Sequence, residues 1–172
     1  MAYLQMNEKK LVPVALELNI LLADYNLYYQ KLRGFHWNIR GKHFFELHEK
    51  FEEMYNDAKV KIDEIAERIV TLQFHPVSQF KEYIAIASVS ETSPLLSDEQ
   101  MVAELLEDHE YLLKQMNEVI LKAEAANDDG TLDLMGSFIR QLEKASWMLD
   151  AWKTESRKNM NQVPKEKLID KS

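Results

Sequence analysis

Residues 47–72, LHEKFEEMYNDAKVKIDEIAERIVTL, are the stretch that decides the fold of this chain. Apolar residues recur through it at alternating spacings of three and four, which is the period of a helix with one buried face. These positions are Leu47, Phe51, Met54, Ala58, Ile62, Ile65, Ile69 and Leu72. The stretch therefore predicts a single long amphipathic helix.

The same rhythm predicts three further long helices. Their apolar stripes span 11–35, 102–123 and 135–152, with breaks at 38–42 and 127–130. Ser97 and Gln100 have the spacing of a capping box at the start of the third. Between Phe74 and Ser97 we predict a long crossover with a small helix at 80–87. The pattern indicates an all-α fold, a ferritin-like four-helix bundle with a short helix in the crossover between the second and third long helices.

Composition agrees with one helical domain. The chain has 172 residues, 46% of them hydrophobic, and only four Gly and four Pro, too few for the turns of an all-β fold. It has no Cys, which excludes thiolate metal sites and disulfides. No apolar run resembles a signal peptide or a membrane span, so we expect a cytoplasmic protein. We assign 1–154 to the bundle and 155–172 to a polar C-terminal tail.

Four metal-ligand side chains share one face of the predicted helix at 47–72. His48, Glu52, Asp63 and Glu67 fall within a sector of about 100° at 3.6 residues per turn. However, Glu52 and Asp63 are eleven residues apart, roughly 16 Å at 1.5 Å rise per residue, so one helix cannot bring all four to one ion. If both pairs serve one site, the second pair comes from another copy of the chain. We therefore expect an oligomer with metal at two-fold interfaces.

The donor types limit the metal without choosing it. Imidazole and carboxylate without sulfur suit Fe, Mn or Zn. His36, which follows an apolar helix and precedes Trp37, is a further candidate ligand. Helical acids are also common as plain surface residues, and for the spacing alone both interpretations stay open. For His43 a capping or surface role is favoured over metal binding, and for His109 a hydrogen-bonded core position is favoured.

Two segments carry a specific family resemblance. They are FHWNIRGKHFFELHEKFE at 35–52 and KIDEIAER at 61–68, and the likeness continues through Trp147 and Trp152. The chain thus resembles the Dps family of ferritin-like miniferritins. The resemblance implies that His36 and His48 are iron ligands from one subunit, and that Asp63 and Glu67 come from its two-fold mate.

The resemblance also implies an activity and an assembly. Members form hollow dodecamers that oxidise Fe(II), preferentially with hydrogen peroxide, store ferric mineral and protect against oxidative damage. Many members carry Asp where this chain has Glu52. We take Glu52 as a ligand or as an acid near the site. Asp128, Asp129 and Asp133 match the region that lines pores in the family, although acids are favoured at any helix start. No His here has Glu three residues before it, so the ferritin site within one bundle is not supported.

DNA binding is the alternative function. Some members of the family bind DNA through Lys-rich tails, but here residues 155–172 carry five Lys or Arg against three acids, and the whole chain has a net charge of −8. Attraction from so few cations falls steeply with salt, although many copies in a shell would add avidity. A helical bundle without chemistry remains the plainest alternative.

Overall fold

A computed structural model describes residues 7–154, and these form five helices without any strand. The helices are α1 (Glu8–Asn38), α2 (Phe44–Thr71), α3 (Phe80–Ile86), α4 (Asp98–Ala126) and α5 (Asp129–Lys153). The predicted all-α bundle with a short crossover helix is confirmed. The tail predicted at 155–172 lies outside the described residues.

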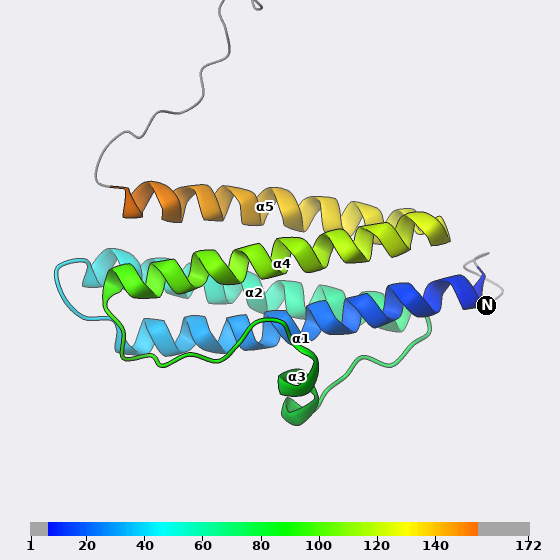
Figure 1. Cartoon of the computed structure of the whole chain (residues 1–172), viewed down its shortest axis with the longest axis horizontal. Coiled ribbons are helices and arrows are strands. Elements are labelled where there is room, and N and C mark those ends of the chain that lie inside the picture. Colours follow the sequence, from blue (N-terminus) through cyan, green and yellow to red (C-terminus); the bar gives the residue numbers. More distant parts are fainter. Residues whose placement is uncertain (1–6, 155–172) are drawn as a thin grey trace, which may run out of the picture.

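The crossover exists because of the directions of the long helices (Figure 1). α1 lies beside α2 and runs opposite to it, and α4 lies beside α5 and also runs opposite to it. α2 and α4 run in the same direction, so the chain must travel back along the bundle between them. It does so over α1, and α3 packs on the outside of that helix.

The apolar stripes predicted from the sequence form the core. All eight stripe positions of α1, from Leu11 to Phe35, are buried, and in α2 only Ile62 is not fully enclosed. Aromatic rings cross between helices at the centre, where Tyr25 of α1 meets Phe138 of α5 edge to face at 6.3 Å between ring centroids. Burial of these faces supplies the main stabilisation of the bundle.

Capping residues explain where α4 begins and where it ends. Ser97 and Gln100 form the predicted capping box, each side chain accepting a hydrogen bond from the other residue's backbone N–H. Asn127 ends the helix in the left-handed conformation, at φ 56°. The following turn is tighter than predicted, because α5 already begins at Asp129 and includes Gly130. One left-handed residue with Asp128 as the next helix cap is enough to reverse the chain.

Two side chains of α1 fasten the crossover to the bundle. Asn19 accepts a hydrogen bond from the backbone of Val77 at 2.8 Å. Asp24 accepts bonds from the backbone of Ser88 at 2.5 Å and of Val89 at 2.9 Å. Burial raises the pKa of Asp24 to about 6, while the two backbone donors act in the opposite direction. The crossover is thus held at both ends of its helix.

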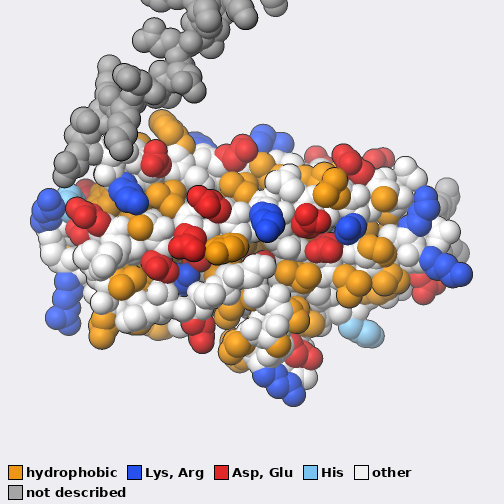
Figure 2. All heavy atoms as spheres, in the orientation of Figure 1, with side chains coloured by type: hydrophobic (Ala, Val, Ile, Leu, Met, Phe, Trp, Pro, Cys, Tyr) orange, Lys and Arg blue, Asp and Glu red, His pale blue; other side chains and the backbone are white. Residues whose placement is uncertain are grey.

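The outer face formed by α4 and α5 carries acidic and basic side chains side by side (Figure 2). Among residues 7–154, every helix is either too short or too polar to span a bilayer.

Candidate metal-binding site

His36 and His48 come together between the end of α1 and the start of α2. Their rings stack with centroids 3.8 Å apart and planes inclined by 20°. The chain reverses between the two helices near Gly41, whose φ of 106° lies in the region that favours glycine. This reversal lets two histidines twelve residues apart share one end of the bundle.

Each ring is fixed by the other residue's backbone. Nδ1 of His36 lies 2.8 Å from the carbonyl oxygen of His48, and Nδ1 of His48 lies 2.9 Å from the carbonyl oxygen of His36. A carbonyl oxygen only accepts, so both Nδ1 atoms carry the proton. In the neutral form of such a ring the lone pair is on Nε2, which is the form of imidazole that binds a metal ion. The reciprocal bonds therefore leave the Nε2 atoms of two stacked rings as candidate metal ligands.

Glu52 lies one turn beyond His48 on the same helix and is exposed. Its Oε1 accepts a hydrogen bond of 3.3 Å from the hydroxyl of Tyr55. The ring of Tyr55 meets the ring of His36 edge to face, at 5.4 Å between centroids. Two histidines and one carboxylate are donors of the types that suit iron and similar ions, and Tyr55 contacts both His36 and Glu52.

Asp63 and Glu67 lie further along α2, and both are exposed. They share the side of the helix predicted from the sequence, but they are separated from Glu52 by at least three turns. Within residues 7–154, no three His, Asp or Glu side chains of one chain are grouped so as to hold an ion. The five predicted ligands therefore lie in two separate groups in a single chain.

Of the three remaining histidines, His43 and His109 make hydrogen bonds to other side chains. His43 occupies the cap position of α2, where its Nδ1 donates to Glu46 at 2.5 Å and its ring contacts Trp152. Trp152 also donates to Glu46, and these two donors lower the pKa of the Glu46 carboxyl. His75 is exposed in the crossover. The hydrogen-bonded core position predicted for His109 is confirmed, since it lies between the hydroxyls of Tyr28 and Ser146.

The three acids predicted to line a pore differ in their surroundings. Asp129 and Asp133 are exposed in the first turns of α5. Asp128 is fully buried, where it accepts bonds from Thr131 and forms an ion pair with Arg68 of α2. Its carboxylate caps α5 inside the chain, so unlike the other two it is not presented at the surface of this subunit.

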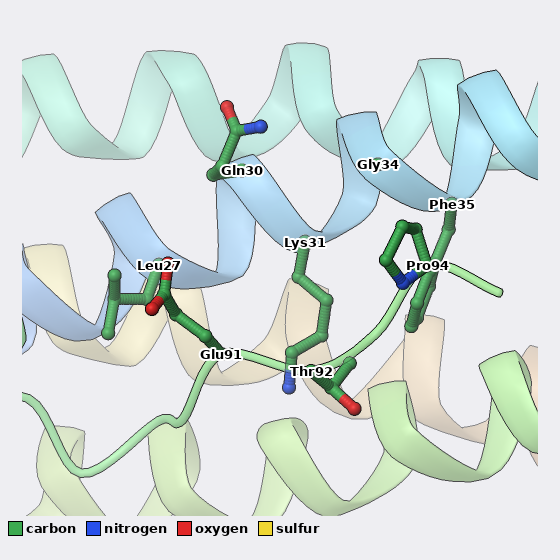
Figure 3. A pocket seen from close by; sticks show the side chains of 8 residues that line it. All are labelled: Leu27, Gln30, Lys31, Gly34, Phe35, Glu91, Thr92 and Pro94. Carbon is green, nitrogen blue, oxygen red and sulfur yellow. The ribbon is translucent and has the colours of Figure 1, made fainter. Parts of the chain in front are cut away.

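A cavity of about 170 Å³ lies between α1 and the crossover, and none of the five predicted ligands lines it (Figure 3). Lys31 is one of the residues that line this cavity, and its Nζ pairs with Asp108 of α4 at 2.7 Å. Burial raises the pKa of Asp108 to about 6, against the opposing effect of Lys31. This buried pair joins α1 to α4.

Sequence reasoning missed two contacts at these places. Tyr55 is three residues from Glu52, a spacing that puts both on one helix face and signals the contact. The pairing of Arg68 with Asp128 joins residues 60 apart in sequence, and no local pattern predicts it. The structure also shows Asp128 as the cap of α5, where its side chain accepts from the backbone N–H of Thr131.

Comparison with known proteins assigns the family. The ferritin-like domain family, Ferritin, matches residues 15–158. The DNA protection during starvation protein of Porphyromonas gingivalis is 41% identical over 150 residues, covering 87% of this chain and 94% of that protein.

Two crystal structures agree. One is of the Dps protein from Vibrio cholerae O1, described as a member of a broad superfamily of ferritin-like diiron-carboxylate proteins. It has a TM-score of 0.84 and 41% identity, covering 87% of this chain and 94% of that one. Dps from Staphylococcus aureus gives a TM-score of 0.80 at 37% identity, with 83% and 96% coverage. On this combined likeness of sequence and fold, the chain belongs to the Dps family of ferritin-like proteins.

Proposed function

We propose that this protein is a ferroxidase that oxidises Fe(II), preferentially with hydrogen peroxide, and stores the ferric product. The observation that carries the proposal is the pair formed by His36 and His48. Both Nδ1 protons are held by backbone carbonyls, which leaves two adjacent Nε2 lone pairs for a metal ion. The relative described as a ferritin-like diiron-carboxylate protein supports iron as that ion.

The ligands in this proposal come from two copies of the chain. One subunit provides His36, His48 and Glu52, and the partner subunit provides the carboxylates at positions 63 and 67. Imidazole binds the incoming Fe(II), and the carboxylates stabilise the Fe(III) that results. Iron is the substrate, and the histidines and acids hold it while it reacts.

A single symmetry axis satisfies both ligand pairs. The midpoint between His48 and Glu67 and the midpoint between Glu52 and Asp63 both fall between residues 57 and 58 of α2. Two antiparallel copies of α2 related by an axis there would bring both pairs together at once, and would create two identical sites.

The same axis also pairs two exposed apolar side chains. It brings Val70, which is 53% exposed, opposite Phe45 of the partner subunit, a residue that is 84% exposed in one chain. Burial of these two side chains between subunits would be favourable. The apolar surface thus supports the axis that the ligands require.

The reaction balances with two ferrous ions and one peroxide molecule. Each Fe(II) gives one electron, the O–O bond breaks, and two protons are taken up to release two water molecules. Because both electrons arrive at one site, no hydroxyl radical needs to be released. This chemistry would protect a cell from oxidative damage.

The proposed assembly is a hollow dodecamer that contains the mineral. Asp129 and Asp133, exposed at the start of α5, are the acids that we propose along the path of incoming iron, with Asp128 holding the helix end behind them. Carboxylates that line a narrow passage favour cations.

DNA binding is the second proposal. The relative from Porphyromonas gingivalis is called a DNA protection during starvation protein, and protection of DNA could come from direct contact or from removal of oxidants. The basic residues on which contact would depend lie in 155–172, outside the described part of the chain.

Peroxide oxidation after anaerobic addition of Fe(II) tests the ferroxidase proposal. In the double variant His36→Ala/His48→Ala, we expect oxidation to slow by more than the roughly 10–100-fold caused by loss of a ligand's hydrogen-bond partner. The matched double variant His43→Ala/His75→Ala should retain the wild-type rate, because neither residue lies among the proposed ligands. Equal rates in all three proteins would overturn the proposal.

A further inference from the structure

Tyr55 contacts two of the proposed iron ligands, which come from different helices. Its hydroxyl donates to Oε1 of Glu52 at 3.3 Å, and its ring lies edge to face against His36 at an interplanar angle of 82°. The ring of Tyr55 is itself supported by Tyr29 of α1, at 6.1 Å between centroids. Tyr55 is therefore a half-buried brace between α1 and the ligand face of α2.

The need for such a brace follows from the glutamate at position 52. A glutamate has one more rotatable bond than an aspartate, so its carboxylate can adopt more positions on an exposed helix face. Holding it in one position costs side-chain entropy that an aspartate would lose to a smaller extent. A hydrogen bond present before the metal arrives removes part of that cost from the binding step.

We propose that Tyr55 is a positioning residue that fixes Glu52 for metal binding. The inference rests on the proposed function, because Glu52 matters here only as a ligand. The Tyr55 hydroxyl occupies one lone pair of Oε1 and leaves Oε2 free to coordinate. In this proposal Tyr55 acts through Glu52 and is not itself a ligand. Carboxylates that bind metal ions are typically hydrogen-bonded to a neighbouring residue, which orients them.

Cobalt(II) titration under anaerobic conditions tests this role without turnover, since the visible absorption of the ion reports its coordination. The part of the wild-type binding curve that disappears in Glu52→Gln defines the binding that depends on Glu52. In Tyr55→Phe, which keeps the ring against His36, we expect that part to weaken by about tenfold. Tyr111→Phe is the matched control, because Tyr111 donates an equally long bond of 3.3 Å to Glu107 on α4. It should bind cobalt as the wild type does.

The substitution Glu52→Asp distinguishes positioning of the carboxylate by Tyr55 from a general packing role of Tyr55. In a Glu52→Asp background the carboxylate is drawn back from the hydroxyl, so Tyr55→Phe should then change cobalt affinity by less than about twofold, because the two substitutions are coupled. An equal loss in both backgrounds, or no loss in Tyr55→Phe alone, would overturn the positioning role while leaving the ferroxidase proposal intact. If the wild-type protein neither binds cobalt nor oxidises iron, both proposals fail together.

Discussion

His109 is the centre of a short buried chain of hydrogen bonds. Its Nε2 lies 2.7 Å from the hydroxyl of Tyr28, and its Nδ1 lies 2.7 Å from the hydroxyl of Ser146. Ser146 donates its own proton to the carbonyl of Leu142 and therefore accepts from Nδ1. Tyr28 then donates to Nε2, so the neutral ring is fully satisfied. Burial lowers the pKa of His109 to about 4.

This lowered pKa gives the stability of the protein a pH dependence with a definite sign. The unfolded chain takes up the His109 proton near pH 6.5, while the folded chain resists until about pH 4. The contribution of neutral His109 is therefore complete above pH 6.5 and is lost as the pH falls toward 4. Between pH 7 and pH 5, we expect the stability advantage of the wild type over His109→Gln to shrink by about 2 kcal/mol.

Denaturant unfolding of both proteins at the two pH values, at equal subunit concentration, measures this change. The wild type is compared with the variant because Asp24 and Asp108 oppose the effect of His109. Their pKa values are raised to about 6, so their contribution to the free energy of unfolding falls as the pH rises through that range. They are present in both proteins. A wild-type advantage that is unchanged between pH 7 and pH 5 would contradict the assigned state of His109.

At the scale of single residues, the sequence predicts whether a side chain is buried better than it predicts which atoms that side chain contacts. His109 falls on an apolar stripe, so its burial and its need for polar partners could be predicted. The stacked rings of His36 and His48 could not, because their Nδ1 atoms bond to backbone that is brought near only when α1 packs against α2. Asp128 was expected at a pore, but its bonds to Arg68 and Thr131 hold it inside.

At the scale of helices, Arg68 joins the end of α2 to the start of α5. Its Nε donates to Thr131 at 2.9 Å, and its guanidinium pairs with Asp128, which is fully buried. Gly130 makes this approach possible, since a Cβ there would lie 2.9 Å from the guanidinium. Helix lengths follow from apolar periodicity, but this joint depends on a contact between distant segments, which periodicity does not encode.

Removing the cation from this joint should destabilise the bundle. In Arg68→Ala the carboxylate of Asp128 stays buried without its partner, and we expect a loss of about 3 kcal/mol in the free energy of unfolding. Lys50→Ala serves as the control, because the partner of Lys50 is the largely exposed Glu53 and such pairs contribute about 1 kcal/mol or less. Chemical denaturation that gave equal, small losses for both variants would show that the joint is not a main support.

At the scale of the whole molecule, the separation of the proposed ligands along α2 is the reason for proposing a site shared between two chains. A rigid helix of 28 residues holds His48 and Glu52 far from Asp63 and Glu67, and bending cannot bring them together. The sequence alone predicted this division, because it depends only on spacing and helical rise. The contacts that join two copies could not be predicted in the same way, since they depend on which side chains the folded bundle leaves exposed.

Mixing two inactive variants tests the shared site most directly. His36→Ala/His48→Ala keeps the acids, and Asp63→Ala/Glu67→Ala keeps the histidines. In a symmetric pair formed from one of each, one of the two sites regains all its ligands and the other loses both sets. Random co-assembly should therefore restore about a quarter of the wild-type rate of iron oxidation by peroxide, while each variant alone stays inactive. Co-assembled mixtures that remain as inactive as the separate variants would contradict a site shared between two chains.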